Sequence, residues 1–198
     1  MADNIEILEK TPRYKGFFEI VSYRFRHRLF AGGWSGEIER EVFERGHAVA
    51  VLPYDPGADA VVLIEQFRIG AVVAGLAPWQ IEIVAGIMED GELPEDVARR
   101  ESQEEAGAAI GTLLPICHYL VSPGGTSESV QVYCGRVDSK GLGGIHGLAE
   151  ENEDIRVEVY SFAAAMAALD AGKITNAVTI IALQWLALNR AHVREMWR

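Results

Sequence analysis

The segment between residues 80 and 107 constrains the fold more than any other part of the sequence. It is predicted to hold a short strand over 80–84 that leads through a glycine into a helix over 94–106. Pro94 suits the first turn of a helix, where its missing N–H costs nothing. Gly107 follows at the position where helices often end in a left-handed residue. A strand followed closely by a helix is therefore expected here.

Pairs of apolar runs separated by turn residues surround this segment and predict antiparallel hairpins. Strands over 17–29 and 35–45 are expected to form one hairpin, and strands over 48–53 and 60–67 a second. Further strands are predicted over 115–121, 130–137 and 155–160, and further helices over 161–169 and from 176 to about 197. Hairpins mixed with a few helices favour an α+β fold, with helices packed on a mixed sheet.

Charge and composition limit the partners of the chain. The formal net charge is −11, which disfavours nucleic acid and anionic membrane surfaces as partners. No apolar run is long enough to span a bilayer, and the N-terminus does not resemble a signal peptide. The two cysteines, Cys117 and Cys134, are interpreted as reduced core thiols. We expect a cytoplasmic protein without nucleic-acid or membrane partners.

Three glutamates share one face of the predicted 94–106 helix. Glu101, Glu104 and Glu105 lie three or four positions apart or adjacent, so their carboxylates point roughly the same way. Like charges at this spacing repel one another, and a hard divalent cation such as Mg²⁺ would relieve the repulsion. The alternative interpretation is a solvated acidic face without a ligand.

The residues around these glutamates form a longer pattern. It consists of Gly86, Glu92, Arg100-Glu101, Glu104-Glu105 and Gly107. This set of positions, here called the box, resembles the consensus of the Nudix hydrolase family, G-x5-E-x7-R-E-U-x-E-E-x-G-U, where U is a bulky aliphatic residue. Every fixed residue is present, whereas Ser102 and Ala108 are small for the U positions.

The resemblance implies an α/β/α sandwich with an N-terminal antiparallel β extension, and a set of metal-binding residues. Roughly two or three Mg²⁺ ions are expected, with Mn²⁺ able to substitute. The implied metal ligands are the backbone carbonyl of Ala85 and the side chains of Glu101, Glu104, Glu105 and Glu153. Arg100 is expected to orient the carboxylates and Glu92 to support the loop before the helix, while Gly86 and Gly107 frame the box.

Two further features make the chain most similar to the ADP-ribose pyrophosphatase branch of that family. Pro123 stands sixteen residues after Gly107, and an acidic loop covers residues 144–156. In similar enzymes such a loop folds over the pyrophosphate and supplies the catalytic base, here Glu151 by position. Glu153 is the matching metal ligand, and the neighbouring Glu150 leaves this assignment open. Taken alone, the acidic run is more typical of a flexible surface loop, and the intact box reverses that preference.

The same resemblance implies how the substrate binds and how the chain assembles. Residues 1–46 are expected to form an extension for dimerisation and adenine binding, and residues 47–198 the Nudix hydrolase domain. In this branch the N-terminal strands of one subunit of a homodimer reach the site of the other. The implied substrate-binding residues are Phe17, Phe18, Arg40, Glu41, Arg45, Arg68, Ile87, Ser122, Pro123, Gly124 and Glu128. Phe17 and Phe18 could equally be core residues.

Three functions are compatible with the sequence. The first is Mg²⁺-dependent hydrolysis of ADP-ribose to AMP and ribose 5-phosphate. The second is hydrolysis of another nucleoside-diphosphate sugar, such as a GDP-sugar. The third is a nucleotide-sensing module without catalysis, which the intact box disfavours.

Overall fold

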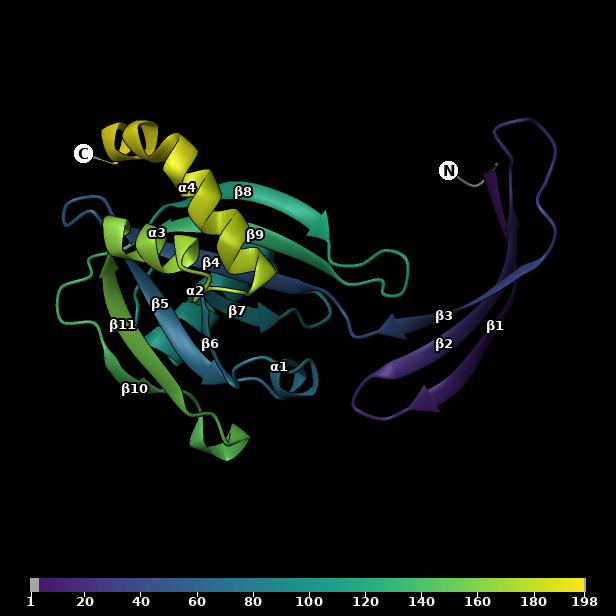
Figure 1. The fold of residues 1–198 in the computed structure, drawn as a ribbon, viewed down its shortest axis with the longest axis horizontal. Helices are drawn as coiled ribbons and strands as arrows, with labels where there is room; N and C mark the ends of the chain where they lie inside the picture. Colours follow the sequence, from purple (N-terminus) through teal and green to yellow (C-terminus); the bar gives the residue numbers. More distant parts are fainter. Residues whose placement is uncertain (1–3, 198) are drawn as a thin grey trace. The chain divides into compact units, whose positions relative to one another are not determined.

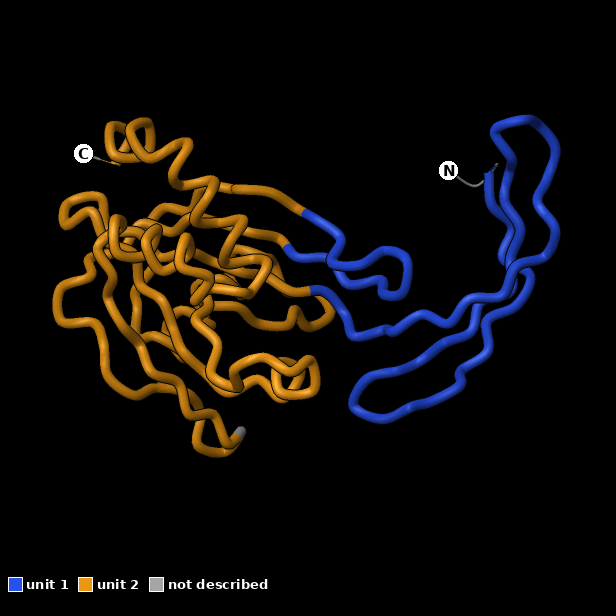
Figure 2. Tube along the Cα trace, in the orientation of Figure 1, with its two compact units in different colours: residues 1–47, 119–130 blue, residues 48–118, 131–198 orange. Residues whose placement is uncertain are grey.

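The computed structural model describes residues 4–197, except for the side chain of Glu151. The chain divides into two compact units, which Figure 2 distinguishes by colour. Unit 1 contains residues 1–47 and 119–130, and unit 2 contains residues 48–118 and 131–198.

Unit 1 contains a three-stranded antiparallel sheet with the order β1-β2-β3 (Figure 1). The strands are β1 (Ile5–Lys15), β2 (Glu19–His27) and β3 (Ile38–Glu44). The predicted hairpin is present as β2 and β3, which pair from Glu19 opposite Glu44 to Phe25 opposite Ile38. Strand β1 was not predicted. It is an edge strand whose residues are nearly all exposed, and beyond Ile7 its sequence does not alternate between apolar and polar residues, so the pattern that identifies a strand is too short.

The larger sheet has eight strands, with the order β10-β11-β5-β4-β9-β8, while β6 pairs with β5 and β7 with β4. Its strands are β4 (Ala48–Asp55), β5 (Ala60–Phe67), β6 (Trp79–Glu82), β7 (Val84–Ile87), β8 (Leu113–Leu120), β9 (Ser129–Arg136), β10 (Gly144–His146) and β11 (Ile155–Ser161). The predicted second hairpin is β4 and β5, which pair antiparallel. Val137 N–H donates to Tyr54 O at 3.1 Å, so the ends of β9 and β4 meet and these strands run parallel. The sheet is therefore mixed, as expected.

Helices cover both faces of this sheet. The helices are α1 (Ile69–Val73), α2 (Pro94–Ala106), α3 (Phe162–Asp170) and α4 (Ala177–Met196), and a short 3₁₀ turn, η2, covers Ala149–Glu151. Val62 and Ile64 of β5 belong to the buried cluster that includes Val97 of α2. The alternate side chains of β5 point to the opposite face, and α3 and α4 pack together on the sheet (Figure 1). The predicted α/β/α sandwich is thus confirmed.

Helix α2 begins and ends as its sequence predicts. Pro94 lies in its first turn, and Gly107 closes it with a φ of 59°, in the left-handed region. Ser102, small for its position in the box, is fully buried and donates its hydroxyl hydrogen bond to Ala98 O at 2.7 Å. Among the described residues, no helix is both long and apolar enough to cross a membrane.

Candidate metal and substrate site

Gly86 allows strand β7 to approach helix α2 closely. Its backbone is fixed by the pairing of β7 with β4, where Gly86 lies opposite Val49. A Cβ atom at residue 86 would overlap the carboxylate of Glu101. Only glycine at this position leaves room for the Glu101 side chain. Steric fit therefore explains why the box begins with a glycine.

Arg100 holds three carboxylates in place. Its Nη1 donates to Glu101 Oε1 at 2.8 Å and to Glu104 Oε2 at 3.2 Å, and its Nη2 lies 3.4 Å from Glu92 Oε1. Glu92 also accepts the backbone N–H of Glu89 at 2.8 Å. One guanidinium therefore joins the loop before α2 to two glutamates of the helix, and charge-assisted hydrogen bonds of this kind fix side-chain orientation.

Glu105 is the buried carboxyl group of the site. Only 4% of the residue is exposed, and one carboxylate oxygen accepts the backbone N–H of Ala85 at 3.1 Å. Burial raises the pKa of Glu105 to about 8, and the negative charges of Glu101 and Glu153 add to this effect. The Ala85 hydrogen bond and the Arg68 guanidinium act in the opposite direction. A nearby cation would stabilise the ionised carboxylate and so lower this pKa.

The acidic loop brings Glu153 toward these glutamates. Glu153 Oε2 accepts the backbone N–H of Leu148 at 3.2 Å, and Leu148 O accepts the backbone N–H of Glu153 at 3.2 Å. The charge of Glu153 contributes to the raised pKa of both Glu101 and Glu105, although burial is the largest cause for each. Glu151, the predicted base, lies in η2, and its side chain is outside the described part of the chain.

Sequence reasoning missed Glu82, a buried acid that fixes the position of Arg68. Glu82 is 4% exposed and accepts hydrogen bonds from Arg68 Nη2 at 2.8 Å and Nε at 3.2 Å. Its other oxygen accepts the side-chain amide N–H of Asn176 at 3.1 Å, and Asn176 also caps α4. An acidic residue between the apolar Ile81 and Ile83 was the available signal.

Unit 1 brings several predicted substrate residues together. The guanidinium carbon of Arg45 lies 5.2 Å from the centre of the Phe18 ring, and Arg45 Nη1 lies 3.4 Å from Glu128 Oε2. Arg45 Nε is buried and has no hydrogen-bond partner among the described residues. Phe18 also packs edge-on against Phe43, with ring centres 5.2 Å apart. Phe18, Arg45 and Glu128 thus form one cluster with an unused N–H donor.

The other predicted substrate residues of unit 1 have separate positions. Phe17 and Phe18 lie in the turn between β1 and β2, not in the predicted strand, and Phe17 is 89% exposed. Arg40 and Glu41 are exposed residues of β3, and Arg40 donates to Glu39 O. Ser122, Pro123 and Gly124 form a turn in which Ser122 O accepts the N–H groups of Gly125 and Thr126. In unit 2, Ile87 ends β7 and is 40% exposed.

The carboxylate cluster in unit 2 fits a hard divalent cation. Among the described residues, no three Asp, Glu, His or Cys side chains are already grouped as a metal site. Burial is the largest cause of the raised pKa of Glu101 and of Glu105, but nearby charges add to it: those of Glu104 and Glu153 for Glu101, and those of Glu101 and Glu153 for Glu105. Oxygen donors with excess negative charge are the ligand type that Mg²⁺ prefers.

The described part of the chain thus has a mixed sheet between two helical layers, with a glutamate-rich helix packed behind a strand glycine. The NUDIX domain model matches residues 44–189. The chain belongs to the Nudix family.

Curated relatives match almost the whole chain. An ADP-ribose pyrophosphatase of Escherichia coli (strain K12) is 51% identical over 195 residues, which cover 98% of this chain and 93% of the relative. An ADP-ribose pyrophosphatase of Haemophilus influenzae is 47% identical over 198 residues, covering 98% and 91%. A GDP-mannose pyrophosphatase of Pectobacterium atrosepticum is 33% identical over 185 residues, covering 93% and 94%.

A solved structure agrees with the fold. The crystal structure of an ADP compounds hydrolase superposes with a TM-score of 0.71 over 96% of this chain and 97% of that chain. The two sequences are only 19% identical, so this likeness concerns the fold.

Proposed function

We propose that this chain hydrolyses the pyrophosphate bond of ADP-ribose to give AMP and ribose 5-phosphate. The observation that carries the proposal is the 51% identity, over 98% of the chain, to an ADP-ribose pyrophosphatase. The complete box and Pro123 support the same activity. The 33% identity to a GDP-mannose pyrophosphatase makes hydrolysis of a GDP-sugar the second candidate.

The proposed cofactor is Mg²⁺, in roughly two or three ions, with Mn²⁺ able to replace it. Glu101, Glu105 and Glu153 would hold it, together with Glu104 and the Ala85 carbonyl. When bound, the metal supplies charge neutralisation for the pyrophosphate and lowers the pKa of a coordinated water. The buried position of Glu105 and the bonds from Arg100 to Glu101 and Glu104 support this set, because they keep the oxygens in a fixed arrangement.

We assign the general base to Glu151 on the acidic loop. It would take the proton from the attacking water while the water oxygen forms a bond to phosphorus and the bridging P–O bond breaks. Glu151→Gln is expected to lower kcat by about 10²–10⁴-fold. Steady-state rates of Glu150→Gln, Glu151→Gln and Glu153→Gln under saturating Mg²⁺ test this. A larger loss in Glu150→Gln would move the base to Glu150.

The proposed substrate contacts are aromatic for the adenine and cationic for the phosphates. The adenine is assigned to Phe17 and Phe18, and the unused Arg45 Nε–H offers a hydrogen-bond donor beside the Phe18 ring. Arg68, held by Glu82, would bind a phosphate oxygen. The remaining proposed contacts are Arg40, Glu41, Ile87, Ser122, Pro123, Gly124 and Glu128.

We further propose a cytoplasmic homodimer in which residues 1–46 form the dimerisation and adenine-binding extension and residues 47–198 the hydrolase domain. The exposed edge strand β1 supports dimerisation, because unpaired strand edges favour association. Both cysteines are free, which suits a reducing compartment. The net charge of −11 disfavours nucleic acid and anionic membranes.

Product analysis with ADP-ribose, GDP-mannose and UDP-glucose, with and without Mg²⁺, tests the activity. Release of AMP from ADP-ribose, abolished by a chelator and restored by Mg²⁺, is the expected result. Turnover of a GDP-sugar alone would reject ADP-ribose but keep the metal assignment. Tight nucleotide binding without turnover of any compound would instead favour the sensing module.

A further inference from the structure

His146 lies at the point where the acidic loop leaves the large sheet. It ends β10, and its partner Ile155 begins β11, so residues 147–154 form the loop between the two strands. Ile155 is fully buried in the core, which fixes one end of the loop. Strand β10 has only three residues and lies at the edge of the sheet, and Ile145 is 68% exposed. Strand pairing alone therefore holds the His146 end of the loop weakly.

The imidazole of His146 packs against the C-terminal end of α2. A Cβ atom at residue 107 would lie 2.9 Å from His146 Cε1, so the ring lies closer to Gly107 than a residue with a side chain would allow without a shift. His146 Nε2 lies 3.1 Å from Gly143 O. Since a carbonyl oxygen only accepts, Nε2 carries the proton and donates. This hydrogen bond holds the ring in the orientation that faces Gly107.

The end of α2 is a firm support for this ring. The N–H of Gly107 donates to Gln103 O at 3.1 Å, which closes the last turn of the helix. The chain beyond Gly107 is held as well, because Arg99 Nη1 donates to Gly111 O at 2.6 Å. The contact with Gly107 therefore ties His146 to a part of the molecule that its own backbone bonds fix in place.

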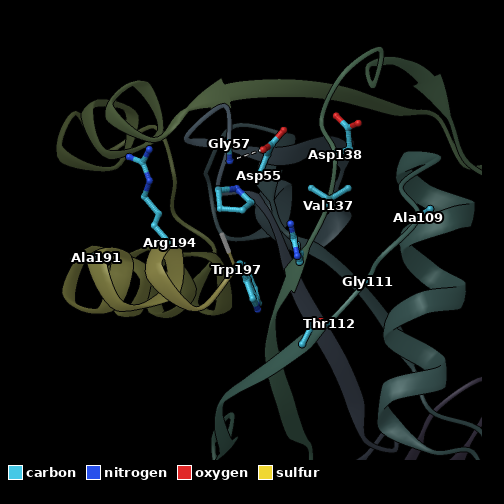
Figure 3. Close-up of a pocket in the computed structure, with 12 residues that line it drawn as sticks. Asp55, Gly57, Ala109, Gly111, Thr112, Val137, Asp138, Ala191, Arg194 and Trp197 are labelled. Carbon is cyan, nitrogen blue, oxygen red and sulfur yellow. Dashed lines mark hydrogen bonds between the residues drawn. The ribbon is translucent and has the colours of Figure 1, made fainter.

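The cavity drawn in Figure 3 borders the same chain segment but takes no part in this contact. Ala109, Gly111 and Thr112 line it, whereas no residue of the box or of the acidic loop does. Its wall carries charges of both signs, including Asp138 and Arg194. The cavity therefore indicates no charged ligand of its own.

The residues after His146 transmit its position to Glu153. Gly147 has a φ of 98°, and a Cβ atom there would lie 2.7 Å from Glu153 Cβ, so the two ends of the loop lie against each other. Leu148 N–H donates to Glu153 Oε2, and Glu153 N–H donates to Leu148 O, each at 3.2 Å. A displacement of His146 would therefore move Glu153 relative to α2.

We propose that His146 is a positioning residue, which anchors the acidic loop to the end of α2 and so places Glu153 beside Glu101 and Glu105. The proposal rests on the proposed function in one respect, the role of Glu153 as a metal ligand. His146 acts through Glu153 and does not touch the reacting atoms. Residues that hold a metal ligand in place typically contribute about 10–100-fold to metal affinity or activity.

Backbone amide exchange in the ¹⁵N-labelled, chelator-treated chain tests the anchor without catalysis. In His146→Ala the amides of Leu148 and Glu153 should exchange at least about tenfold faster, because the loop opens more often. The amides of β4 should keep their rates, which separates a loosened loop from a loosened fold. Mn²⁺ binding, followed by electron paramagnetic resonance, should weaken by about 10–100-fold. The Mg²⁺ concentration for half-maximal hydrolysis of ADP-ribose should rise by a similar factor.

Ile145→Ala is the matched control, because it shortens the neighbouring side chain of β10, which is exposed to solvent. This variant should match the parent chain in amide exchange and in Mn²⁺ binding. His146→Gln keeps a side-chain N–H donor for Gly143 O. It should retain most of the protection and of the Mn²⁺ affinity that His146→Ala loses.

Unchanged exchange of Leu148 and Glu153 in His146→Ala would overturn the proposal, and so would equal acceleration in Ile145→Ala. A His146→Gln variant as defective as His146→Ala would reject the hydrogen bond to Gly143 O as part of the anchor. A parent chain that does not hydrolyse ADP-ribose would reject the proposed function. The amide exchange would still decide the role of His146 in that case, so the two failures are distinguishable.

Discussion

Glu105 is a carboxylic acid that folding places where its charged form is unfavourable. Glutamate usually has a pKa of 4.5, whereas burial and the charges of Glu101 and Glu153 raise the pKa of Glu105 to about 8. Between pH 4.5 and about 8, Glu105 therefore keeps its proton in the folded chain but has lost it in the unfolded chain. Stability should therefore fall as pH rises through this range.

We expect Glu105→Gln to stabilise the metal-free chain at alkaline pH. At pH 8.5 the melting temperature should rise by at least about 4 °C, because one unit of pKa corresponds to about 1.4 kcal/mol. Near pH 4.5 the two chains should unfold at similar temperatures, since Glu105 is then protonated in the folded state. Thermal unfolding followed by circular dichroism in the presence of a chelator measures this.

Glu104→Gln serves as the control, because the side chain of Glu104 is 32% exposed on the same helix. It should show no comparable gain at pH 8.5. Equal pH dependence of the Glu105→Gln variant and the parent chain would contradict the role of burial. The Glu105→Gln variant should also lose Mg²⁺-dependent turnover although its fold survives.

At the scale of elements, the helices and strands that could be predicted from the sequence are those marked by hydrophobic periodicity and by turn or cap residues. Helix α2 was predicted with its observed bounds, because Pro94 and Gly107 mark its ends. Strand β1 was missed because its apolar residues do not form a buried face. Pro12 in this strand is tolerated because an edge strand does not need every N–H for pairing.

The residues of the candidate site that lie close together in the sequence could be predicted, and those that meet only through tertiary packing could not. The glutamates of α2 follow from helical spacing, whereas the contact of Glu82 with Asn176 depends on tertiary packing. The hydrogen bonds from Arg68 and Asn176 to Glu82 join residues 14 and 94 positions apart in the chain. No local pattern specifies the longer of these contacts.

Asn176 should couple the start of α4 to the position of Arg68. Its side chain accepts the backbone N–H of Thr179 as a helix cap and donates to Glu82. We expect Asn176→Ala to lower stability by about 0.5–2 kcal/mol through loss of the cap. It should also raise KM for ADP-ribose, because Glu82 then fixes Arg68 less firmly.

Ser161→Ala is a matched comparison, since Ser161 caps α3 by accepting the N–H of Ala164 and, in the described part of the chain, makes no hydrogen bond to Glu82. Denaturant unfolding and steady-state kinetics of both variants separate the two effects. Similar stability losses with a raised KM only in Asn176→Ala are expected. An equal KM in both variants would show that the cap acts on stability alone.

At the scale of the whole molecule, the proposed dimer depends on the exposed apolar side chains of β1. Ile7 is 57% exposed in this strand. We expect Ile7→Lys to shift the chain from dimer to monomer in sedimentation at micromolar concentration, because a charge would be buried in the interface. Activity on ADP-ribose should fall in parallel if the partner's strands complete the site.

Leu188→Lys is the control for Ile7→Lys, because it introduces the same charge at another exposed apolar side chain. Leu188 lies in α4 and is 87% exposed. This control should remain dimeric. A parent chain that sediments as a monomer would reject the dimer outright. Dissociation in Leu188→Lys instead of Ile7→Lys would move the interface to α4.

Helix α4 has a consequence for the order in which the molecule matures. Asn176 bonds to Glu82 across 94 residues, and Arg190 bonds to Asp59 across 131 residues. Closing loops of this length costs entropy before any contact is gained, so these bonds are expected to form late. During synthesis on the ribosome, the box leaves the exit tunnel well before α4 exists. The nascent chain would therefore carry its acidic helix early, but Arg68 would be firmly held only once translation is almost complete.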